Sequence, residues 1–475
     1  MDLKRNVYKR LIEWKENNAH STLEISGARQ VGKTYLINKF ADEYFKNKLY
    51  INLFELSGKQ FMECYHQALS WKPGTKRPEH PLHEVFSLYE PDFQDTDDTV
   101  IIIDEIQESA EIYNRIREFT RQFKCHLIVT GSYLGRVYEP EFRYSSGDVT
   151  KITIYTLSYE EFLLAYDEAL YDEYRKLAKG ECGKDIHDDL KAVYDIYCRI
   201  GGYPKVVDTY LITKEEQKAQ EELVKIIDTF MNESIRYFTD ILDSQVFTQI
   251  FLSICRILNR EKKGLAEDSI SEELQKIVTK DYSSNITKAA CNRAISWLYF
   301  SGIIGFCAKI TEMDILEFKP ASRCYFMDLG VANYYLRLTG TDSRVLAGTL
   351  NENYVYINLK KRQDFPPEIT FETPAFATYK GGEIDFVAQS LRTDVRYLIE
   401  VKAGKGTAST GSNVEDNGDG TYTITVSNSS GVALPKTGGI GTKKYTTGGL
   451  AMMTFAIAGY LMYIDRKRRK KGGVE

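Results

Sequence analysis

Apolar residues between positions 20 and 132 fall into three short runs, each followed by small or polar residues. The segment TLEISGARQVGKTYLINKF begins with Leu23 and Ile25, passes through a glycine-containing loop and continues into YLINKFADEYF, whose apolar residues have helical spacing. The other two runs are residues 100–103 and the segment HLIVTGS. Continuous apolar runs are typical of parallel strands that are buried on both faces. The pattern therefore predicts an α/β domain with a parallel sheet.

The middle of the chain, from about residue 212 to 304, has apolar positions at spacings of three and four and is predicted to be α-helical. Within it, SISEELQKIV and SSNITKAACNRAISWLYFSGII have the helix, turn, helix, strand order of a winged helix. One interpretation places Lys288, Asn292 and Arg293 on a helix that contacts DNA. The other makes the region a packing module with a solvated polar face, because Lys and Arg are not clustered enough to neutralise many phosphates.

The last third of the chain changes character twice. LNENYVYINLKKR is predicted to be an amphipathic helix, followed by strands around ITFETPAF, GGEIDFVAQ and VRYLIEVKAG. A small-residue stretch, GKGTASTGSNVEDNGDG, then leads to the alternating strand TYTITVSNSSG. Residues 448–464 form an uncharged, largely apolar run with six basic residues at 466–471, which predicts one short transmembrane helix with a basic stop.

Length, composition and net charge exclude few of the fold and function classes considered above. A chain of 475 residues with 43% hydrophobic and 27% charged residues is expected to form several folded domains. A net charge of −5 excludes a global basic field, so any nucleic-acid binding would need a local patch. The cysteines are scattered without a CxxC pair, and the charged N-terminus does not have the pattern of a signal peptide. We therefore expect residues 1–403 to be cytoplasmic.

The loop after the first strand has the spacing GxxxxGK[ST], formed by Gly27, Gly32, Lys33 and Thr34. Glycines let the backbone turn so that amides and a helix N-terminus face a polyphosphate. Lys33 would neutralise phosphate charge, and the Thr34 hydroxyl would bind Mg²⁺. This predicts ATP and Mg²⁺ as cofactors. The residues expected to contact the nucleotide are Gly27, Ala28, Arg29, Gln30, Val31, Gly32, Lys33, Thr34 and Tyr35.

Two further strand ends carry polar residues that suit this site. Asp104 and Glu105 follow the apolar run 100–103, where Asp104 fits as a partner of Mg²⁺ and Glu105 as the base that polarises water. The alternative is a helix start with two acidic caps. Thr130 and Ser132 end the segment HLIVTGS and could sense the γ-phosphate, and the alternative is a plain turn.

These segments resemble the bacterial and archaeal AAA-type ATPases that begin with a GARQVGKT loop and end in a restriction-endonuclease-like domain. The matching pieces are GARQVGKT, the strand with Asp104 and Glu105, TGS, TLSYEEF (residues 156–162) and GGYP (residues 201–204). Many relatives have a Gly-Arg pair before the LSxxEF segment, whereas here Gly147 is followed by Asp148. The source of any arginine that acts on the γ-phosphate is therefore open, and an oligomer is compatible with the resemblance.

Four residues beyond position 350 resemble the PD-(D/E)xK nuclease core. Glu400 and Lys402 are one residue apart on a predicted strand and so share a face, and Asp385 follows a Gly-Gly turn. The resemblance implies that Asp385 and Glu400 hold Mg²⁺, that Lys402 positions water, and that Glu352 is a further metal ligand. The alternative is a degenerate fold that is used only for binding, including binding to DNA.

The C-terminus resembles a sortase sorting signal. Leu434, Pro435, Thr437 and Gly438 fit LPxTG, and the apolar run and basic tail complete its three parts. The resemblance implies cleavage between Thr437 and Gly438 by sortase, attachment of Thr437 to peptidoglycan, and passage of the tail through the membrane. TYTITVSNSSG resembles the last strand of a pilin domain without the strands that should pair with it. A sortase substrate must first cross the membrane, but the N-terminus does not have the pattern of a signal peptide. We therefore hypothesise that the chain is a fusion of two genes, with its junction near residues 403–410.

The predicted organisation is therefore a P-loop ATPase domain of the AAA type followed by four further segments. Their ranges are 1–165 for the ATPase domain, 166–335 for the helical and winged-helix-like domain, 336–403 for a truncated α/β nuclease-like domain, 404–433 for a linker with an unpaired strand, and 434–475 for the sorting signal with its transmembrane helix. Two other functional classes stay open. One is a cell-wall-anchored surface protein, and the other is a nucleotide-dependent binding switch with negligible turnover.

Overall fold

The fold is taken from a computed structural model, which describes most of the chain up to residue 428. The described residues are 2–17, 21–70, 80–132, 140–143, 147–179, 186–237, 245–258, 276, 278, 287–311, 315–317, 323–364, 374–379, 382–389, 396–403, 414–416 and 421–428. The chain divides into two compact units. The N-terminal unit is Lys4–Tyr155 with Phe300–Gly302, and the C-terminal unit is Met1–Leu3, Thr156–Tyr299 and Ile303–Glu475.

The N-terminal unit is built on a parallel sheet. Its described strands are β1 (Thr22–Ser26), β2 (Asn47–Asn52), β3 (Thr99–Asp104), β4 (His126–Thr130) and β5 (Val149–Thr153). They lie in the order β2-β3-β4-β1-β5, and every pair is parallel. The helices are α1 (Tyr8–Glu16), α2 (Lys33–Tyr44), α3 (Leu56–Leu69), α4 (Pro81–Tyr89), η1 (Ile106–Glu108), α5 (Ala110–Tyr113) and α6 (Ile116–Gln122). The parallel-sheet α/β fold predicted from the apolar runs is confirmed.

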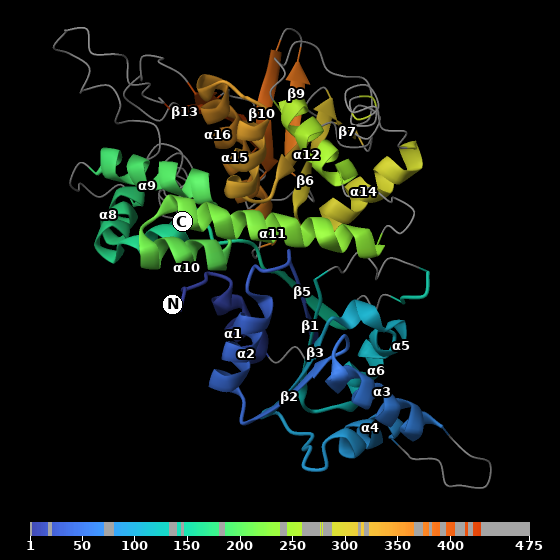
Figure 1. The fold of residues 1–475 in the computed structure, drawn as a ribbon. Coiled ribbons are helices and arrows are strands. Elements are labelled where there is room, and N and C mark those ends of the chain that lie inside the picture. Colours follow the sequence, from blue (N-terminus) through green and yellow to red (C-terminus); the bar gives the residue numbers. More distant parts are fainter. Residues whose placement is uncertain are drawn as a thin grey trace, which may run out of the picture. The chain divides into compact units, whose positions relative to one another are not determined.

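Helices cover both faces of this sheet, with α1 and α2 on one side and α3 to α6 on the other (Figure 1). Side chains alternate between the faces of a strand, so Ile101 and Ile103 pack into the same cluster as Phe61 and Phe86 from α3 and α4. Phe40 of α2 is fully buried as well. Each large apolar side chain buried in this way stabilises the fold by roughly 1.5 to 3 kcal/mol. Burial on both faces explains why the central strands read as unbroken apolar runs.

The C-terminal unit combines a helical region with a mixed sheet. Its described helices are α7 (Tyr159–Tyr166), α8 (Glu168–Ala178), α9 (His187–Ile200), α10 (Pro204–Thr213), α11 (Glu216–Tyr237), α12 (Gln245–Leu258), α14 (Lys288–Phe300), α15 (Leu329–Leu338) and α16 (Ser343–Asp364). Its described strands are β6 (Ile304–Thr311), β7 (Ile315–Glu317), β8 (Arg323–Phe326), β9 (Ala375–Tyr379), β10 (Gly382–Gln389), β11 (Arg396–Ala403), β12 (Val414–Asp416) and β13 (Thr421–Asn428).

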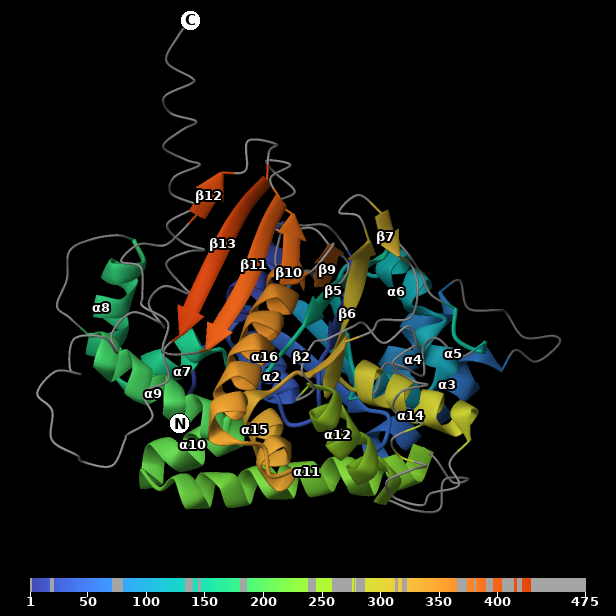
Figure 2. The ribbon, with the colours of Figure 1, turned by 90° about the horizontal axis from the view of Figure 1, so that it is seen from above.

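These strands form one sheet in the order β12-β13-β11-β10-β9-β6-β7, with β8 paired to β6 (Figure 2). The structure therefore differs from the domain division that we predicted. A boundary at residue 335 would separate β6 from β9, yet the two strands pair in parallel from Ala308 and Ala375 onward. A parallel pair is joined by a long crossover, which local sequence patterns do not reveal.

The strand that we predicted to be unpaired is not. Thr421–Asn428 pairs in parallel with Arg396–Ala403 along its whole length, and β12 pairs with its other edge. Part of the predicted 404–433 linker thus extends the sheet of the preceding domain. The physical reason is that a strand at the edge of a sheet leaves its backbone N–H and C=O groups available, and an alternating β-prone segment nearby can satisfy them.

The TLSYEEF and GGYP motifs, which the sequence provides no reason to connect, meet in the C-terminal unit. Leu157 N donates a hydrogen bond to Gly202 O at 2.7 Å, and the Tyr197 hydroxyl donates to Leu157 O at 2.6 Å. A Cβ atom at Gly202 would lie 2.2 Å from Leu157 O. In the same turn Gly201 has a φ of 78°, a conformation that favours glycine. The two glycines of GGYP are therefore required by close packing and by backbone geometry.

Several predictions fall partly or wholly outside the described residues. The first helix of the predicted winged helix is one of them, whereas its second helix corresponds to α14 and its strand to β6. The sorting signal at 434–438 and the span at 448–464 also lie outside. Among the residues that the structure describes, no helix is long and apolar enough to cross a membrane. The cysteines in the described part are free thiols.

Candidate nucleotide-binding site

The loop between β1 and α2 turns at residues whose backbone conformation is unusual. Gly27 has a φ of 139°, and a Cβ atom there would lie 2.1 Å from the carbonyl oxygen of Ile154. Gly32 precedes α2 with a φ of 89°, and Gln30 has a φ of 61°. Glycine adopts such conformations without the steric strain that a Cβ atom causes. The loop therefore reaches the N-terminus of α2 in a tight turn, and a helix N-terminus favours an anion such as phosphate.

Lys33 is held within this loop. Its Nζ donates hydrogen bonds to the carbonyl oxygens of Gly27 at 2.8 Å and Ala28 at 2.9 Å, and the residue is only 8% exposed. A buried ammonium group needs such acceptors because desolvation of its charge is costly. Phosphate oxygens are stronger acceptors than carbonyl oxygens, since they carry full charge. The arrangement therefore places one positive charge where a polyphosphate would contact the loop.

Thr34 and Asp104 are 70 residues apart in sequence and directly bonded in the structure. Thr34 Oγ1 donates to Asp104 Oδ2 at 3.0 Å, and the backbone N–H of Glu105 donates to Asp104 Oδ1 at 2.8 Å. Because the hydroxyl hydrogen is directed to the carboxylate, the lone pairs of Thr34 Oγ1 are free to bind a cation. A hydroxyl oxygen with a carboxylate behind it fits Mg²⁺, which is bound through few protein oxygens and keeps several waters.

Tyr50, which the sequence analysis missed, also contacts Asp104. Its hydroxyl donates to Asp104 Oδ2 at 2.7 Å, and β2 and β3 are neighbours in the sheet. Burial raises the pKa of Tyr50 above its usual value, and the hydrogen bond to Asp104 and the charge of that carboxylate raise it further. The phenol thus stays protonated and holds Asp104 in one orientation. Only the strand order could have identified it, because its position near the end of β2 has no chemical signature.

Replacing Tyr50 with phenylalanine should raise the Mg²⁺ concentration needed for half-maximal ATP hydrolysis by about tenfold, because groups that orient a metal-binding residue typically contribute 10- to 100-fold in metal affinity. The maximal rate at saturating Mg²⁺ should change much less. The measurement is hydrolysis against Mg²⁺ concentration, with Tyr44→Phe near the far end of α2 as the control. An unchanged Mg²⁺ dependence would show that Tyr50 has no role in orienting Asp104.

Glu105 is oriented by three donors from two segments. Its Oε2 accepts hydrogen bonds from Gln107 Nε2, from Ser132 Oγ at 2.9 Å and from Ser132 N at 3.4 Å. Burial alone would raise the pKa of Glu105, but these hydrogen bonds and the charge of Arg29 outweigh it and lower the pKa below its usual value. Glu105 is therefore ionised at neutral pH. Its carboxylate can therefore accept a hydrogen bond from a water molecule and orient it.

The two predicted sensor residues have different surroundings. The strand β4 lies between β1 and β3. Thr130 is fully buried, and its Oγ1 donates to Ile25 O at 2.9 Å, which links β4 to the strand that precedes the loop. Ser132, just beyond β4, instead reaches Glu105. Of the two hydroxyls, Ser132 is the one connected to the acid.

The remaining loop residues lie at the start of α2 and beside the N-terminal segment. Arg5 donates hydrogen bonds through Nη1 to Val31 O at 3.1 Å and through Nη2 to Tyr155 O. This residue near the N-terminus therefore connects the loop to the segment that follows β5. Tyr35 is 55% exposed. It borders an open cavity of about 530 Å³ that is lined by Thr34, Tyr35, Asn38, Lys39, Asp42 and Glu43.

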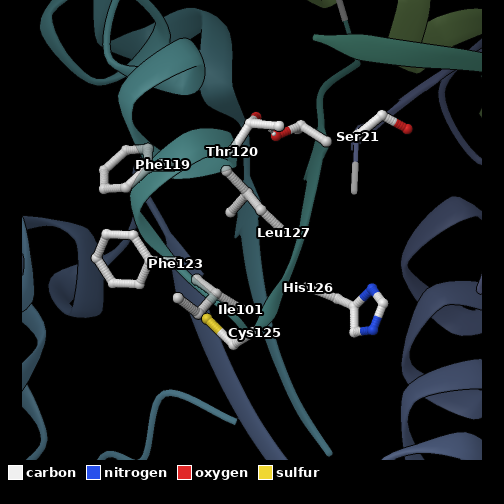
Figure 3. Close-up of a pocket in the computed structure, with 9 residues that line it drawn as sticks. Ser21, Ile101, Phe119, Thr120, Phe123, Cys125, His126 and Leu127 are labelled. Atoms are coloured by element: carbon white, nitrogen blue, oxygen red, sulfur yellow. Dashed lines mark hydrogen bonds between the residues drawn. The ribbon is translucent and has the colours of Figure 1, made fainter. Parts of the chain in front are cut away.

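A second, small pocket is lined by residues of β1, β3, β4 and α6 and their neighbours (Figure 3). Thr22 and His126, which line it, are the first residues of β1 and β4. Ligands of parallel α/β sheets bind at the carboxyl ends of the strands. This pocket at the amino ends is therefore packing space between the sheet and α6, and the loop with Lys33 is the candidate site.

The predicted nuclease-like residues lie in the C-terminal unit. Asp385 is on β10 and Glu400 on β11, next in sequence to Phe386 and Ile399, which are partners in the antiparallel register of the two strands. Glu352, on α16, accepts a hydrogen bond from the Tyr325 hydroxyl. The side chain of Lys402 lies outside the described residues. Within the described part of the chain, no group of three or more His, Cys, Asp or Glu side chains has an arrangement that could hold a metal ion.

Comparison with known families finds three matches. Residues 19–163 match an AAA domain, residues 191–342 match a domain of unknown function, and residues 426–472 match the LPXTG cell wall anchor motif. No curated protein matches the chain. None of the matched families is described as a nuclease, so the nuclease-like domain stays a prediction.

Several solved structures resemble the chain. One is the Walker-type ATPase of Pyrococcus abyssi, with 16% identity and a TM-score of 0.43, covering 71% of this chain and 96% of that one. Another is the ORC2 protein of Aeropyrum pernix in ADPNP and ADP complexes, with 12% identity, a TM-score of 0.33 and coverage of 74% and 94%. A third is the RuvB Holliday junction branch migration motor of Thermotoga maritima, with 14% identity, a TM-score of 0.26 and coverage of 63% and 88%. The match of residues 19–163 to an AAA domain agrees with the prediction from the loop and strand motifs.

Proposed function

We propose that the chain is a Mg²⁺-dependent ATPase that uses Lys33, Thr34, Asp104 and Glu105. The observation that supports this most strongly is the hydrogen bond from Thr34 to Asp104, because it brings together the loop motif and the acidic strand end that a P-loop ATPase uses to bind Mg²⁺. The AAA domain match over the same residues supports it independently.

Each residue has a separate task in this proposal. Lys33 exchanges its carbonyl acceptors for phosphate oxygens and neutralises their charge. Thr34 offers its hydroxyl oxygen to Mg²⁺, with Asp104 behind it. Bound Mg²⁺ would supply charge neutralisation across the phosphates. Glu105, held by Ser132, orients the attacking water. Ser132 thereby links the end of β4 to the position where the γ-phosphate is expected.

Replacing Glu105 with glutamine separates an ATPase from a nucleotide-dependent binding switch. The variant should bind ATP with Mg²⁺ as the wild type does, while phosphate release falls by about 100-fold or more, because general-base assistance contributes about 10²- to 10⁴-fold. Glu108→Gln, on the same 3₁₀ turn and exposed, is the matched control. A wild-type chain that binds ATP and releases no phosphate above this variant would favour the switch.

A second candidate function is anchoring to the cell wall, and the match of residues 426–472 to the LPXTG motif favours it. Sortase would then join Thr437 to peptidoglycan. Cells that express the full chain should release it from the wall fraction only after muramidase digestion, and replacing Thr437 with alanine should abolish this. Recovery of all chains in the cytoplasmic fraction would exclude anchoring and support the fusion hypothesis for the tail.

DNA as a partner is a further proposal, based on the winged-helix-like order around α14. Asn292 and Arg293 are exposed on this helix. If the helix contacts phosphates, Arg293→Ala should weaken binding to duplex DNA and reduce its salt dependence. Binding that is absent at 50 mM salt would leave the region as a packing module, which was the other interpretation of its sequence.

A further inference from the structure

A buried arginine lies among the carboxylates that resemble a nuclease metal site. Arg323 is on β8 and pairs antiparallel with Cys307 of β6. Its Nη1 lies 3.8 Å from Glu352 Oε1, and the same atom donates to the carbonyl oxygen of Asp385 at 3.4 Å. The side chain of Arg323 is 12% exposed and that of Glu352 is 16% exposed. These contacts join β8, α16 and β10 around one positive charge.

The guanidinium is fixed from its face as well as from its edge. Arg323 Cζ lies 4.1 Å from the ring centroid of Phe376, a residue of β9 that is fully buried. A cation over an aromatic face is attracted by the ring, more strongly when water is excluded. The planar guanidinium is weakly hydrated, so it tolerates this position better than an ammonium group would. The Arg323 side chain is therefore held in one position by contacts with β9, β10 and α16.

The acids of the cluster already have other partners. Asp385 Oδ2 accepts the backbone N–H of Val401 at 2.7 Å, at a register shift of the sheet between Ile384 and Val387. Glu352 Oε1 accepts the Tyr325 hydroxyl. Each acid therefore has an oxygen that is committed to the protein. These hydrogen bonds fix the orientation of the two carboxylates and use part of their accepting capacity, which leaves fewer lone pairs for the near-octahedral ligand sphere that Mg²⁺ requires.

We infer that Arg323 is the resident cation of this cluster and takes the place that a divalent metal ion would need. A second positive charge at that place would be repelled by the guanidinium, and the small exposure of Arg323 and Glu352 limits screening by water. The acid cluster of the C-terminal unit is accordingly a metal-independent structural centre. This inference is independent of the proposed ATPase function, because every residue in it belongs to the C-terminal unit.

Replacing Arg323 with a neutral residue should allow the acid cluster to bind a divalent metal ion. In Arg323→Gln the carboxylates lose their counter-charge, so the variant should melt at a lower temperature than the wild type. Mn²⁺ at 10 mM, an ion that tolerates oxygen ligands, should raise that melting temperature by about 3 °C through binding to the native state. The same ion should not act through this cluster in the wild type. Arg175→Gln, an exposed arginine of α8, is the matched control.

The double variant Arg323→Gln/Asp385→Asn assigns the effect to the cluster, since any Mn²⁺ bound near Thr34 is common to all variants. The double variant should lose the Mn²⁺-dependent shift. If Arg323→Gln does not fold, the wild type still decides the question by Mn²⁺ titration with electron paramagnetic resonance. A bound ion in the wild type that is lost in Asp385→Asn, or no shift in a folded Arg323→Gln, would overturn the inference.

Discussion

Replacing Lys33 with alanine is expected to reduce ATP hydrolysis by about 10²- to 10³-fold, because loss of one preorganised charged donor to the reacting group has this effect in buried sites. Lys33 is the residue whose Nζ lies within the loop, bonded to Gly27 O and Ala28 O. Phosphate release from ATP at saturating Mg²⁺ is the measurement. ATP affinity should also fall, because the ammonium group neutralises charge in the bound state as well as in the transition state.

The control for this variant is Lys46→Ala. Lys46 belongs to the same unit, but its side chain is 79% exposed and pairs with Asp98 at the surface. Exposed pairs contribute roughly 0 to 1 kcal/mol, so this variant should hydrolyse ATP normally. If Lys33→Ala hydrolyses ATP at the wild-type rate, the loop that contains Lys33 has no role in ATP hydrolysis.

The largest effect on stability is expected from Asp328→Ala in the C-terminal unit. Asp328 is 4% exposed and begins α15, where its carboxylate accepts hydrogen bonds from the backbone N–H groups of Gly330 and Val331. It also accepts the N–H of Gly202 at 2.8 Å, which ties α15 to the GGYP turn. Removing it leaves these buried donors unpaired, so the free energy of unfolding should fall by about 3 to 5 kcal/mol. Urea denaturation of the full chain measures this.

Asp167→Ala is the matched control for that variant. Asp167 also precedes a helix, α8, and accepts one N–H, from Leu170, but it is exposed. Its loss should reduce the free energy of unfolding by about 1 kcal/mol or less. Equal effects of the two substitutions would show that burial and the link to Gly202 contribute nothing to the role of Asp328.

The acid–base behaviour of Asp328 adds a pH dependence. Burial raises the pKa of Asp328 above its usual value, although the N–H groups of Gly202 and Val331 partly oppose this. The native state therefore holds a proton at pH values where the unfolded chain has lost it. Stability from this group is complete below the unfolded pKa and declines as the pH rises through the folded pKa. Asp328→Asn, which cannot ionise, should flatten this decline in melting temperature against pH.

The nucleotide site illustrates how far local sequence information extends. The spacing of Gly27, Gly32, Lys33 and Thr34 and the apolar strand before Asp104 predicted a strand, loop, helix unit and an acidic strand end, and both are present. These features are local, since periodicity and glycine content determine the conformation of a few neighbouring residues. Tyr50 is different. Its contact with Asp104 depends on which strand lies next to β3, and nothing within β2 specifies its neighbour.

The C-terminal unit shows the same limit more strongly. The sequence indicated a helix containing Glu352 and strands containing Asp385 and Glu400, and the structure has them. It did not indicate that Arg323, from a short strand before that helix, lies between two of these elements. Nor did it indicate that Thr421–Asn428 pairs with Arg396–Ala403. The omission of Arg323 and the error about this strand both concern partners from other elements, and both change what is expected of the region.

By itself, the sequence predicted the strand, the glycine-dependent turn at Gly27 and the helix that follows, the apolar strand before Asp104, and the residue types that we propose contact phosphate and metal. Only the tertiary structure decided which elements are neighbours: β4 between β1 and β3, Asp328 against Gly202, and Arg323 beside Glu352. The physical reason is that backbone conformation follows from short-range sterics and periodic burial. Pairing between distant segments instead depends on the packing of the whole core, which no local pattern records.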